Sequence, residues 1–497
     1  MLRKIRITLA VLFFVGVTLL LLDFTGTLHH WLGWMARVQF LPALLALNAV
    51  VLVALVLLTL VFGRIYCSVI CPLGVMQDVL SHLNRKKNRF TYSRALTWLR
   101  LVMLAVMAVA IIAGLGSLMA LLAPYSSYGR IAGNLLQPLY IWCNNGLAAI
   151  AEHYESYAFY SKEVWIKSLP TFLIALVTFV VIAVLAWRGG RTYCNPICPV
   201  GTVLGYLAKF SWLKVYFDAD KCRSCSLCSK NCKASCIDFK SHTVDYTRCV
   251  ACGNCLSKCN FDALHYGHPK SLKPSTEGKE PSQASTPTNE ARRAFLLGGA
   301  IVAANVALAQ AGKKVDGGLA EIVDRTPPQR KTRITPPGSV SASNMQHHCT
   351  ACQLCVAQCP NDVLRPSGDL LTLMQPTLSF EHGFCRPECT RCSEVCPTGA
   401  ICPIDAAQKT SIQIGHAVWI RDNCVVLTDG VDCGNCARHC PTGAIMMVPT
   451  DPDDDESPMV PAVDHTKCIG CGQCEYVCPA RPFGAIYVEG NETHGEA

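Results

Sequence analysis

The sequence predicts a polytopic α-helical membrane bundle of about five spans that carries two small α+β modules rich in cysteine. Long apolar segments fill the first 190 residues, and the mean hydropathy of the whole chain is +0.29. The chain has 31 cysteines among 497 residues, more than a structural core needs. Cysteine in this number indicates disulfides in a small secreted domain or metal ligation in a larger protein. The formal charge of +9 comes with basic residues that cluster beside the apolar segments, which favours a membrane over nucleic acid as the partner.

Four apolar segments account for the predicted spans of the first domain, and they cover residues 7–22, 40–62, 98–123 and 169–187. Each approaches or exceeds the ~20 residues that cross a hydrocarbon core. Basic clusters precede the first segment, separate the second from the third and follow the fourth, whereas loops 23–39 and 124–168 lack such clusters. Residues 1–215 are therefore predicted to form a four-span membrane domain with both ends in the cytoplasm.

One motif occurs twice, each time directly after an apolar segment: GRIYCSVICPLG at residues 63–74 and GRTYCNPICPVG at residues 190–201. The repetition predicts two tandem hairpins related by a pseudo-two-fold axis along the membrane normal. The two cysteines of each motif are spaced i, i+4, which puts them on one face of a helix, and the proline after the second favours a helix end. A shared metal or iron–sulfur site is one reading, and redox-active or docking thiols or plain helix packing are the others. The four candidate cofactor-binding residues are Cys67, Cys71, Cys194 and Cys198.

The rest of the chain divides by composition. Residues 216–268 form a polar, cysteine-dense module, and residues 269–290 are rich in Pro, Ser, Thr and Lys and are predicted to be a disordered linker. Residues 291–311 place a twin arginine before an apolar run, which predicts a fifth span or a Tat-like signal anchor. A Pro-rich linker over residues 312–345 leads to a second cysteine-rich domain over residues 346–497, which this topology places in the periplasm.

Six cysteine runs in these two regions predict six [4Fe–4S] clusters in bacterial-ferredoxin-like modules, one cytoplasmic and one extracytoplasmic. In the spacing C-x2-C-x2-C-x3-C, three thiolates on a tight loop hold one cluster, and the fourth, expected at the start of the following helix, reaches its neighbour. Zinc would favour separate C-x2-C pairs, and disulfides within such short loops would be strained. The regular runs are Cys222, Cys225, Cys228 and Cys232; Cys249, Cys252, Cys255 and Cys259; Cys349, Cys352, Cys355 and Cys359; and Cys468, Cys471, Cys474 and Cys478. The variant runs are Cys385, Cys389, Cys392 and Cys396, and Cys424, Cys433, Cys436 and Cys440.

The fourth cysteine of each run is expected to cross to a partner run. In the first module, Cys259 joins the run that begins at Cys222, and Cys232 joins the run that begins at Cys249, with Cys236 as a competitor for Cys232. In the second module we expect the outer two runs to exchange their fourth cysteines and the inner two to do likewise. The three remaining cysteines are expected to be bystanders: Cys143, Cys236 and Cys402.

With four apolar segments, two C-x3-C-P motifs and a two-cluster module, residues 1–267 resemble the NapH-type membrane ferredoxins of periplasmic nitrate reductase systems. From the twin arginine at residues 292–293 onward, the chain is similar to the NapG/MauM-type periplasmic polyferredoxins. The resemblance implies a fused, multi-pass protein of the bacterial inner membrane, with the quinone pool and a periplasmic reductase or cytochrome as partners and no nucleic acid.

The function expected from these features is electron transfer from quinol to a periplasmic acceptor, by a quinol-oxidising subunit rather than a stand-alone enzyme. The alternative is a redox-sensing or maturation factor for a metalloenzyme. Tyr66 and Tyr193 of the repeated motif are either quinone hydrogen-bond partners or interface anchors. One difficulty attends the main reading. Both motifs are predicted at the cytoplasmic edge, so they do not by themselves bridge a ~30 Å hydrocarbon core.

Overall fold

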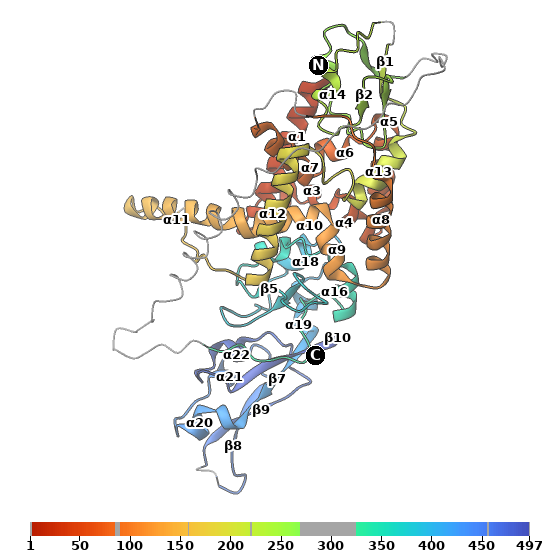
Figure 1. Cartoon of the computed structure of the whole chain (residues 1–497). Coiled ribbons are helices and arrows are strands. Elements are labelled where there is room, and N and C mark those ends of the chain that lie inside the picture. The colour runs from red at the N-terminus through yellow and green to blue at the C-terminus, as the bar shows by residue number, and fades with distance from the viewer. Residues whose placement is uncertain are drawn as a thin grey trace, which may run out of the picture.

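A computed structural model describes residues 2–84, 90–157, 159–218, 221–268, 325–454 and 457–496. A central helical bundle carries one cysteine-rich module at each end, with the chain's N-terminus beside the first module and its C-terminus in the second (Figure 1). The predicted linker 269–290, the predicted fifth span 291–311 and residues 312–324 of the second linker lie outside the described residues.

Two helices of the described chain are long and apolar enough to cross a membrane: residues Arg3–Leu22 within α1 (Leu2–Leu22), and α12 (Leu169–Gly189). The predicted membrane domain has four spans in the described part of the chain, so the two long helices found there do not bear out the expected count. The second apolar segment is split into α4 (Phe40–Leu45) and α5 (Ala49–Phe62), because Leu47 takes a positive φ of 50° and the Asn48 side chain caps α5. The third is split into α8 (Thr97–Ile112) and α9 (Gly116–Leu122) by Gly114, whose φ is 66°. Hydropathy alone does not detect these local breaks.

The last helix of each half of the bundle packs against the other half. In the first half α5 leads through α6 (Tyr66–Val69) to α7 (Pro72–Leu83), and in the second half α12 leads to α13 (Pro199–Ala208). Helix α7 packs against α12 and α1, whereas α13 packs against α5 and α8. Each repeat thus places its last helix on a long helix of the other repeat, as expected for halves related by a pseudo-two-fold axis. Pro72 and Pro199 each begin their helix at the first position, where a missing N–H costs nothing.

The connection between α9 and α12 enters the bundle rather than skirting it. Helix α10 (Pro124–Ile131) is buried along its whole length and packs against α7 and α12. A short π-helical turn, Ala132–Leu136, leads to α11 (Gln137–His153), which projects from the side of the bundle (Figure 1). Two short helices, α2 (His29–Leu32) and α3 (Trp34–Arg37), follow α1.

Both modules are α+β, as predicted, and each sheet has two antiparallel strands. In the first module β1 (Lys214–Phe217) pairs with β4 (Leu264–Gly267), and β2 (Ile237–Asp238) pairs with β3 (Thr243–Val244). Its short helices are α14 (Leu227–Lys230) and a 3₁₀ turn, Leu256–Lys258.

The second module is built in two parts joined by the long pair of β7 (Ile412–Trp419) with β10 (Ile486–Glu496). The part next to the bundle contains α16 (Ala342–His348), α17 (Leu354–Ala357), β5 (Leu364–Pro366), β6 (Pro376–Leu378), α18 (Arg391–Val395) and α19 (Ala406–Ser411). The distal part contains α20 (Val425–Thr428), α21 (Asn435–Arg438), β8 (Ile445–Pro449), β9 (Met459–Val463) and α22 (Gln473–Val477). One continuous apolar core runs from Val250 of the first module through the bundle to Val488 of the second.

Candidate iron–sulfur centres

The four regular cysteine runs share one backbone conformation. In each run the residues just before and just after the second cysteine have positive φ: Ser224 and Ser226, Ala251 and Gly253, Ala351 and Gln353, and Gly470 and Gly472. Alternating left-handed residues curl the chain into the kind of concave loop that binds anions and iron–sulfur centres. In all four runs the third thiol lies in electrostatic contact with the first two. The spacing therefore encodes a loop that gathers three thiols.

In five of the six runs a short helix contains the third cysteine, not the fourth as expected, and in the other run Cys255 directly precedes the 3₁₀ turn Leu256–Lys258. Cys228, Cys355, Cys392, Cys436 and Cys474 lie within α14, α17, α18, α21 and α22. The fourth cysteine follows the end of the helix, and in five of the six runs the residue three positions later has positive φ: Ser235, Asp262, Asp362, Gly399 and Gly443. This turn directs the chain away from its own cysteine loop after the fourth thiol, so the fourth thiol can face a neighbouring loop.

In the first module Cys232 lies with the other run, as the crossed scheme predicts. One cavity is lined by Cys232, Cys249, Cys252 and Cys255. The same cavity is lined by Cys236, whose Sγ lies 3.5 Å from that of Cys232. Cys236 therefore lies beside the same cavity, and the choice between Cys232 and Cys236 as fourth ligand stays a prediction. The joining of Cys259 to the run that begins at Cys222 stays a prediction.

The nested exchange expected in the second module is wrong, because the thiols group between consecutive runs. Cys396 lies in electrostatic contact with the three thiols of the first run. Three cavities show the other groups: one is lined by Cys359, Cys385, Cys389 and Cys392, the next by Cys424, Cys433, Cys436 and Cys478, and the third by Cys440, Cys468, Cys471 and Cys474. Each part of the module thus contains two runs that exchange their fourth cysteines within that part.

These four-thiol sets continue from one part of the module to the other. The backbone N–H of Cys385 donates to the carbonyl of Cys471 at 2.9 Å, which joins a set of the bundle-proximal part to a set of the distal part. The cysteines nearest the bundle, in the run from Cys349 to Cys359, are buried, whereas Cys433 and Cys436 at the far end are half-buried. In the first module Cys225 is exposed. Each part of the second module holds both buried and half-buried cysteines, so burial does not fall steadily along the chain of sets.

The chemistry of these sets fits iron–sulfur clusters. Burial raises the pKa of the Cys352 and Cys471 thiols to about 12 and that of Cys436 to about 11, so at neutral pH they stay protonated unless a metal displaces the proton. Among the described residues no three His, Cys, Asp or Glu side chains converge closely enough for a single metal ion. Thiols around a four-iron cube stand farther apart than thiols around one ion, and the cavities between them suit the larger group. When bound, such clusters accept and give up single electrons.

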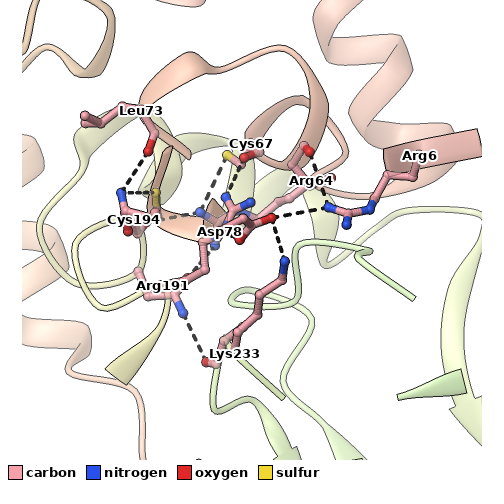
Figure 2. Close-up of polar contacts among 12 residues, drawn as sticks. Arg6, Arg64, Cys67, Leu73, Asp78, Arg191, Cys194 and Lys233 are labelled. Atoms are coloured by element: carbon pink, nitrogen blue, oxygen red, sulfur yellow. Dashed lines mark hydrogen bonds and ion pairs between the residues drawn. The ribbon is translucent and has the colours of Figure 1, made fainter. Parts of the chain in front are cut away.

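The four thiols of the repeated motif also come together, inside the bundle. Cys67, Cys71, Cys194 and Cys198 are buried, with 3–4% of each exposed, and Cys198 lies in electrostatic contact with the other three. Two fully buried arginines cross between the repeats (Figure 2). Arg64 of the first repeat donates to the Cys194 carbonyl at 3.2 Å, and Arg191 of the second donates to the Cys67 carbonyl at 2.5 Å.

The glycines of the motif are required by this exchange. A Cβ added to Gly74 would lie 2.3 Å from the Cys67 carbonyl oxygen and 2.8 Å from the Arg191 guanidinium. At the matching position, a Cβ on Gly201 would lie 2.4 Å from the Cys194 carbonyl and 2.7 Å from Arg64. The two copies of the motif therefore adopt the same geometry. In each copy the arginine binds the cysteine loop of the other half.

Sequence reasoning missed the charged residues around these thiols. Asp78 of α7 lies 2.7 Å from Arg191 Nε, 2.5 Å from Lys233 Nζ and 3.3 Å from Arg6 (Figure 2). Burial alone would raise the pKa of Asp78, but Arg191 and Lys233 outweigh it and hold that pKa far below its usual range. The signal for Arg64 and Arg191 was present in the repeat, since both copies begin with Gly-Arg.

Both tyrosine hydroxyls of the motif are engaged within the protein. Tyr66 donates to the Gln39 side chain at 3.0 Å and accepts from the Phe40 N–H at 3.0 Å. Tyr193 donates to the Leu122 carbonyl at 3.3 Å. They are buried, and their partners give them a role in packing the bundle.

Comparisons with known proteins agree with this chemistry. A family model described as a 4Fe-4S binding domain matches residues 44–89 and 171–215, and one described as a 4Fe-4S dicluster domain matches residues 431–481. The first covers both copies of the repeated motif. The second covers most of the two distal runs, in agreement with their consecutive grouping.

Several curated proteins are similar in sequence. The putative electron transport protein YccM of Escherichia coli (strain K12) is 25% identical over 228 residues, which cover 44% of this chain and 55% of YccM. The methylamine utilization ferredoxin-type protein MauM of Methylophilus methylotrophus is 30% identical over 166 residues, 32% of this chain and 71% of MauM. The ferredoxin-type protein NapF of Escherichia coli (strain K12) is 27% identical over 157 residues, 31% of this chain and 85% of NapF. No solved structure matches.

Proposed function

Because the chain belongs to the family of NapH-, NapG- and MauM-type iron–sulfur polyferredoxins, we propose that it carries electrons from membrane quinol to a periplasmic reductase or cytochrome. An iron–sulfur electron-transfer role is common to the named relatives. We propose in addition that the electron donor is quinol, that the acceptor is periplasmic and that the chain holds six [4Fe–4S] clusters.

The observation that carries the proposal is the placement of the cysteine sets in a row through the molecule. The first module and the second module lie at opposite ends of the helical bundle (Figure 1). Within the second module the Cys385 N–H bonded to the Cys471 carbonyl joins a set of the part next to the bundle to a set of the distal part. A sensor needs one redox centre, whereas a succession of centres serves to move electrons over a distance.

The bundle is proposed to lie in the bacterial inner membrane. Helices α1 and α12 expose large apolar side chains, among them Leu12 at 59%, Val15 at 46%, Leu173 at 50% and Val177 at 61%. Exposing such apolar faces to water is unfavourable, whereas contact with lipid is not. The basic clusters of the sequence favour a cytoplasmic first module and a periplasmic second module, which is part of the proposal.

The residues contribute in distinct ways. The cysteine thiolates hold the clusters, and burial together with hydrogen bonds to sulfur sets the potential at which each accepts an electron. Quinol gives up two electrons and two protons, so it reduces two such centres in succession and releases its protons to water. The set that contains Cys433 and Cys436 lies in the part of the second module far from the bundle, and from that end a soluble acceptor is reached (Figure 1).

The test uses the whole chain, purified anaerobically with its lipids. We expect at least about 24 irons per chain, enough for six four-iron clusters, and EPR signals of reduced [4Fe–4S] centres after addition of a quinol analogue. A protein without iron would refute the proposal. Clusters that stay oxidised with quinol, and that no periplasmic acceptor drains, would favour a redox-sensing or maturation role instead.

A further inference from the structure

Among the described residues, the four thiols in the bundle are surrounded by more positive charge than nearby carboxylates neutralise. Arg64 and Arg191 are fully buried, Lys233 is 7% exposed, and Asp78 is the carboxylate that faces Arg191, Lys233 and Arg6. Within the part of the chain that the structure describes, Arg64 Nε and Arg191 Nη2 are buried without a hydrogen-bond partner, as is Gln77 Oε1. An unpaired buried cation is strongly destabilising, because nothing compensates for its removal from water. Such an excess calls for an anion beside these side chains.

The hydrogen-bond donors of this group point at sulfur. Gln77 Nε2 donates to Cys194 Sγ at 3.2 Å, Arg64 Nη2 lies 3.8 Å from Cys67 Sγ, and the Gly201 N–H donates to Cys198 Sγ at 3.4 Å. Donors to sulfur stabilise thiolates and the sulfur ligands of iron clusters. A cube of four irons and four sulfides with four thiolates is a dianion in its oxidised form, so it supplies the missing negative charge.

Resting on the proposed function, we propose that Cys67, Cys71, Cys194 and Cys198 together bind one [4Fe–4S] cluster, which joins the two end modules into a single electron route. Each segment that matches the 4Fe-4S binding domain supplies only two of these cysteines, so neither repeat completes a cluster alone. The arginine exchange holds the two half-sites face to face.

On one side this site contacts the first module at its inner set of thiols. Lys233, which pairs with Asp78, directly follows Cys232 in the chain, and the Arg191 N–H donates to the Lys233 carbonyl at 2.8 Å. Arg64 donates to the Thr247 carbonyl at 2.9 Å, two residues before Cys249. The arginine beside the bundle thiols therefore also holds a loop of the nearest four-thiol set.

On the other side the buried helix α10 links the site to the second module. A Cβ on Gly129 would lie 2.3 Å from the Cys352 carbonyl, so the α10 backbone touches the loop of the first periplasmic run. Arg130, fully buried, lies in electrostatic contact with both Tyr193 and Cys352. Tyr193 is the neighbour of Cys194 in the chain. The path from the bundle thiols to Cys352 therefore passes through packed side chains.

This route removes the need for a diffusing carrier between the two modules. A reduced cluster in one module gives one electron to the oxidised cluster in the bundle, and that cluster gives the electron to the nearest set of the other module. Each step oxidises one centre and reduces the next, with no bond made or broken. Quinol remains the two-electron source at the start.

The first experiment counts iron and sulfide in the full chain, purified anaerobically. We expect about 28 irons in the wild type and about 24 in the Cys67→Ala/Cys194→Ala variant, a loss of about one seventh. The matched control is Cys143→Ala/Cys402→Ala, which removes two exposed thiols and is expected to keep the wild-type count. Retained EPR signals of the end modules show that the variant is folded. Equal iron in wild type and variant overturns the inference, while the proposed function survives if the end modules are loaded.

The second experiment tests the route in quinone-free liposomes. A membrane-impermeant viologen-type reductant added outside is expected to bleach the clusters of both modules in the wild type. In the Cys67→Ala/Cys194→Ala variant only the module on the outer face is expected to bleach. Bleaching of both modules in the variant, or of one module in the wild type, would contradict an electron route through the bundle.

Discussion

Replacement of Arg64 with glutamine tests how the buried arginines act on the site between the repeats. The guanidinium Nη2 lies 3.8 Å from Cys67 Sγ. At an effective dielectric constant of about 20, one charge at this distance is worth about 4 kcal/mol. For a one-electron couple that corresponds to about 170 mV, taking about 59 mV per 1.4 kcal/mol. Charge spread over a whole cluster weakens this interaction, so we expect the potential to fall by roughly 50–150 mV.

The direction follows from charge, because reduction adds a negative charge that the guanidinium stabilises. The assay is a redox titration of the full chain followed by EPR, with iron content measured in the same sample. Arg64→Lys keeps the charge and is expected to restore most of the potential, although it loses the fork that also reaches Asn195 and Thr247. A potential unchanged within about 20 mV in the fully loaded glutamine variant would refute the electrostatic reasoning.

Four further predictions concern stability and ligation. Asp78→Asn leaves three cations without their carboxylate and should lower the free energy of unfolding by about 3–5 kcal/mol, measured by denaturant titration in detergent. Gly74→Ala forces a Cβ against the Cys67 carbonyl, and we expect a loss of about 1–3 kcal/mol in the same assay. Burial lowers the pKa of His494 from 6.5 to about 4, so the unfolded chain binds a proton more readily and stability falls as the pH drops through this range. His494→Gln should remove about 2 kcal/mol of that acid sensitivity, measured as the difference in unfolding free energy between pH 7 and pH 5. Cys236→Ala should keep the full iron content if Cys232 is the ligand.

The controls and contrary outcomes are specific to each change. Asp453→Asn alters an exposed carboxylate and should leave stability within about 0.5 kcal/mol, so an equal loss in both variants would argue against the buried ion-pair network. Gly146→Ala adds a Cβ with no atom within 4 Å and should be neutral or stabilising, as Ala is in a helix. A pH profile of His494→Gln identical to that of the wild type would show that the ring does not titrate as described. Loss of about four irons in Cys236→Ala would make Cys236 the ligand in place of Cys232.

The sequence was sufficient for the local features of this protein. The C-x2-C-x2-C spacing predicted loops that gather three thiols, and these loops share the same left-handed residues. The two α+β modules were predicted from the same runs. The repeated motif predicted two matched halves, because a fixed set of glycines, arginine and cysteines is needed wherever that geometry is built.

Only the tertiary structure decided which distant parts meet. The spacing within a loop does not say which run supplies its fourth cysteine. The predicted nested exchange was wrong because runs that are consecutive in the chain pack against each other in the same part of the module. Apolar length predicted continuous spans at residues 40–62 and 98–123, but Leu47 and Gly114 break them through local backbone conformation. The contact of α10 with the Cys352 loop depends on a connection that enters the bundle, and hydropathy carries no information about that course. The conformation of each cysteine loop depends on residues that are neighbours in the sequence, whereas the order of the centres depends on how the whole chain packs.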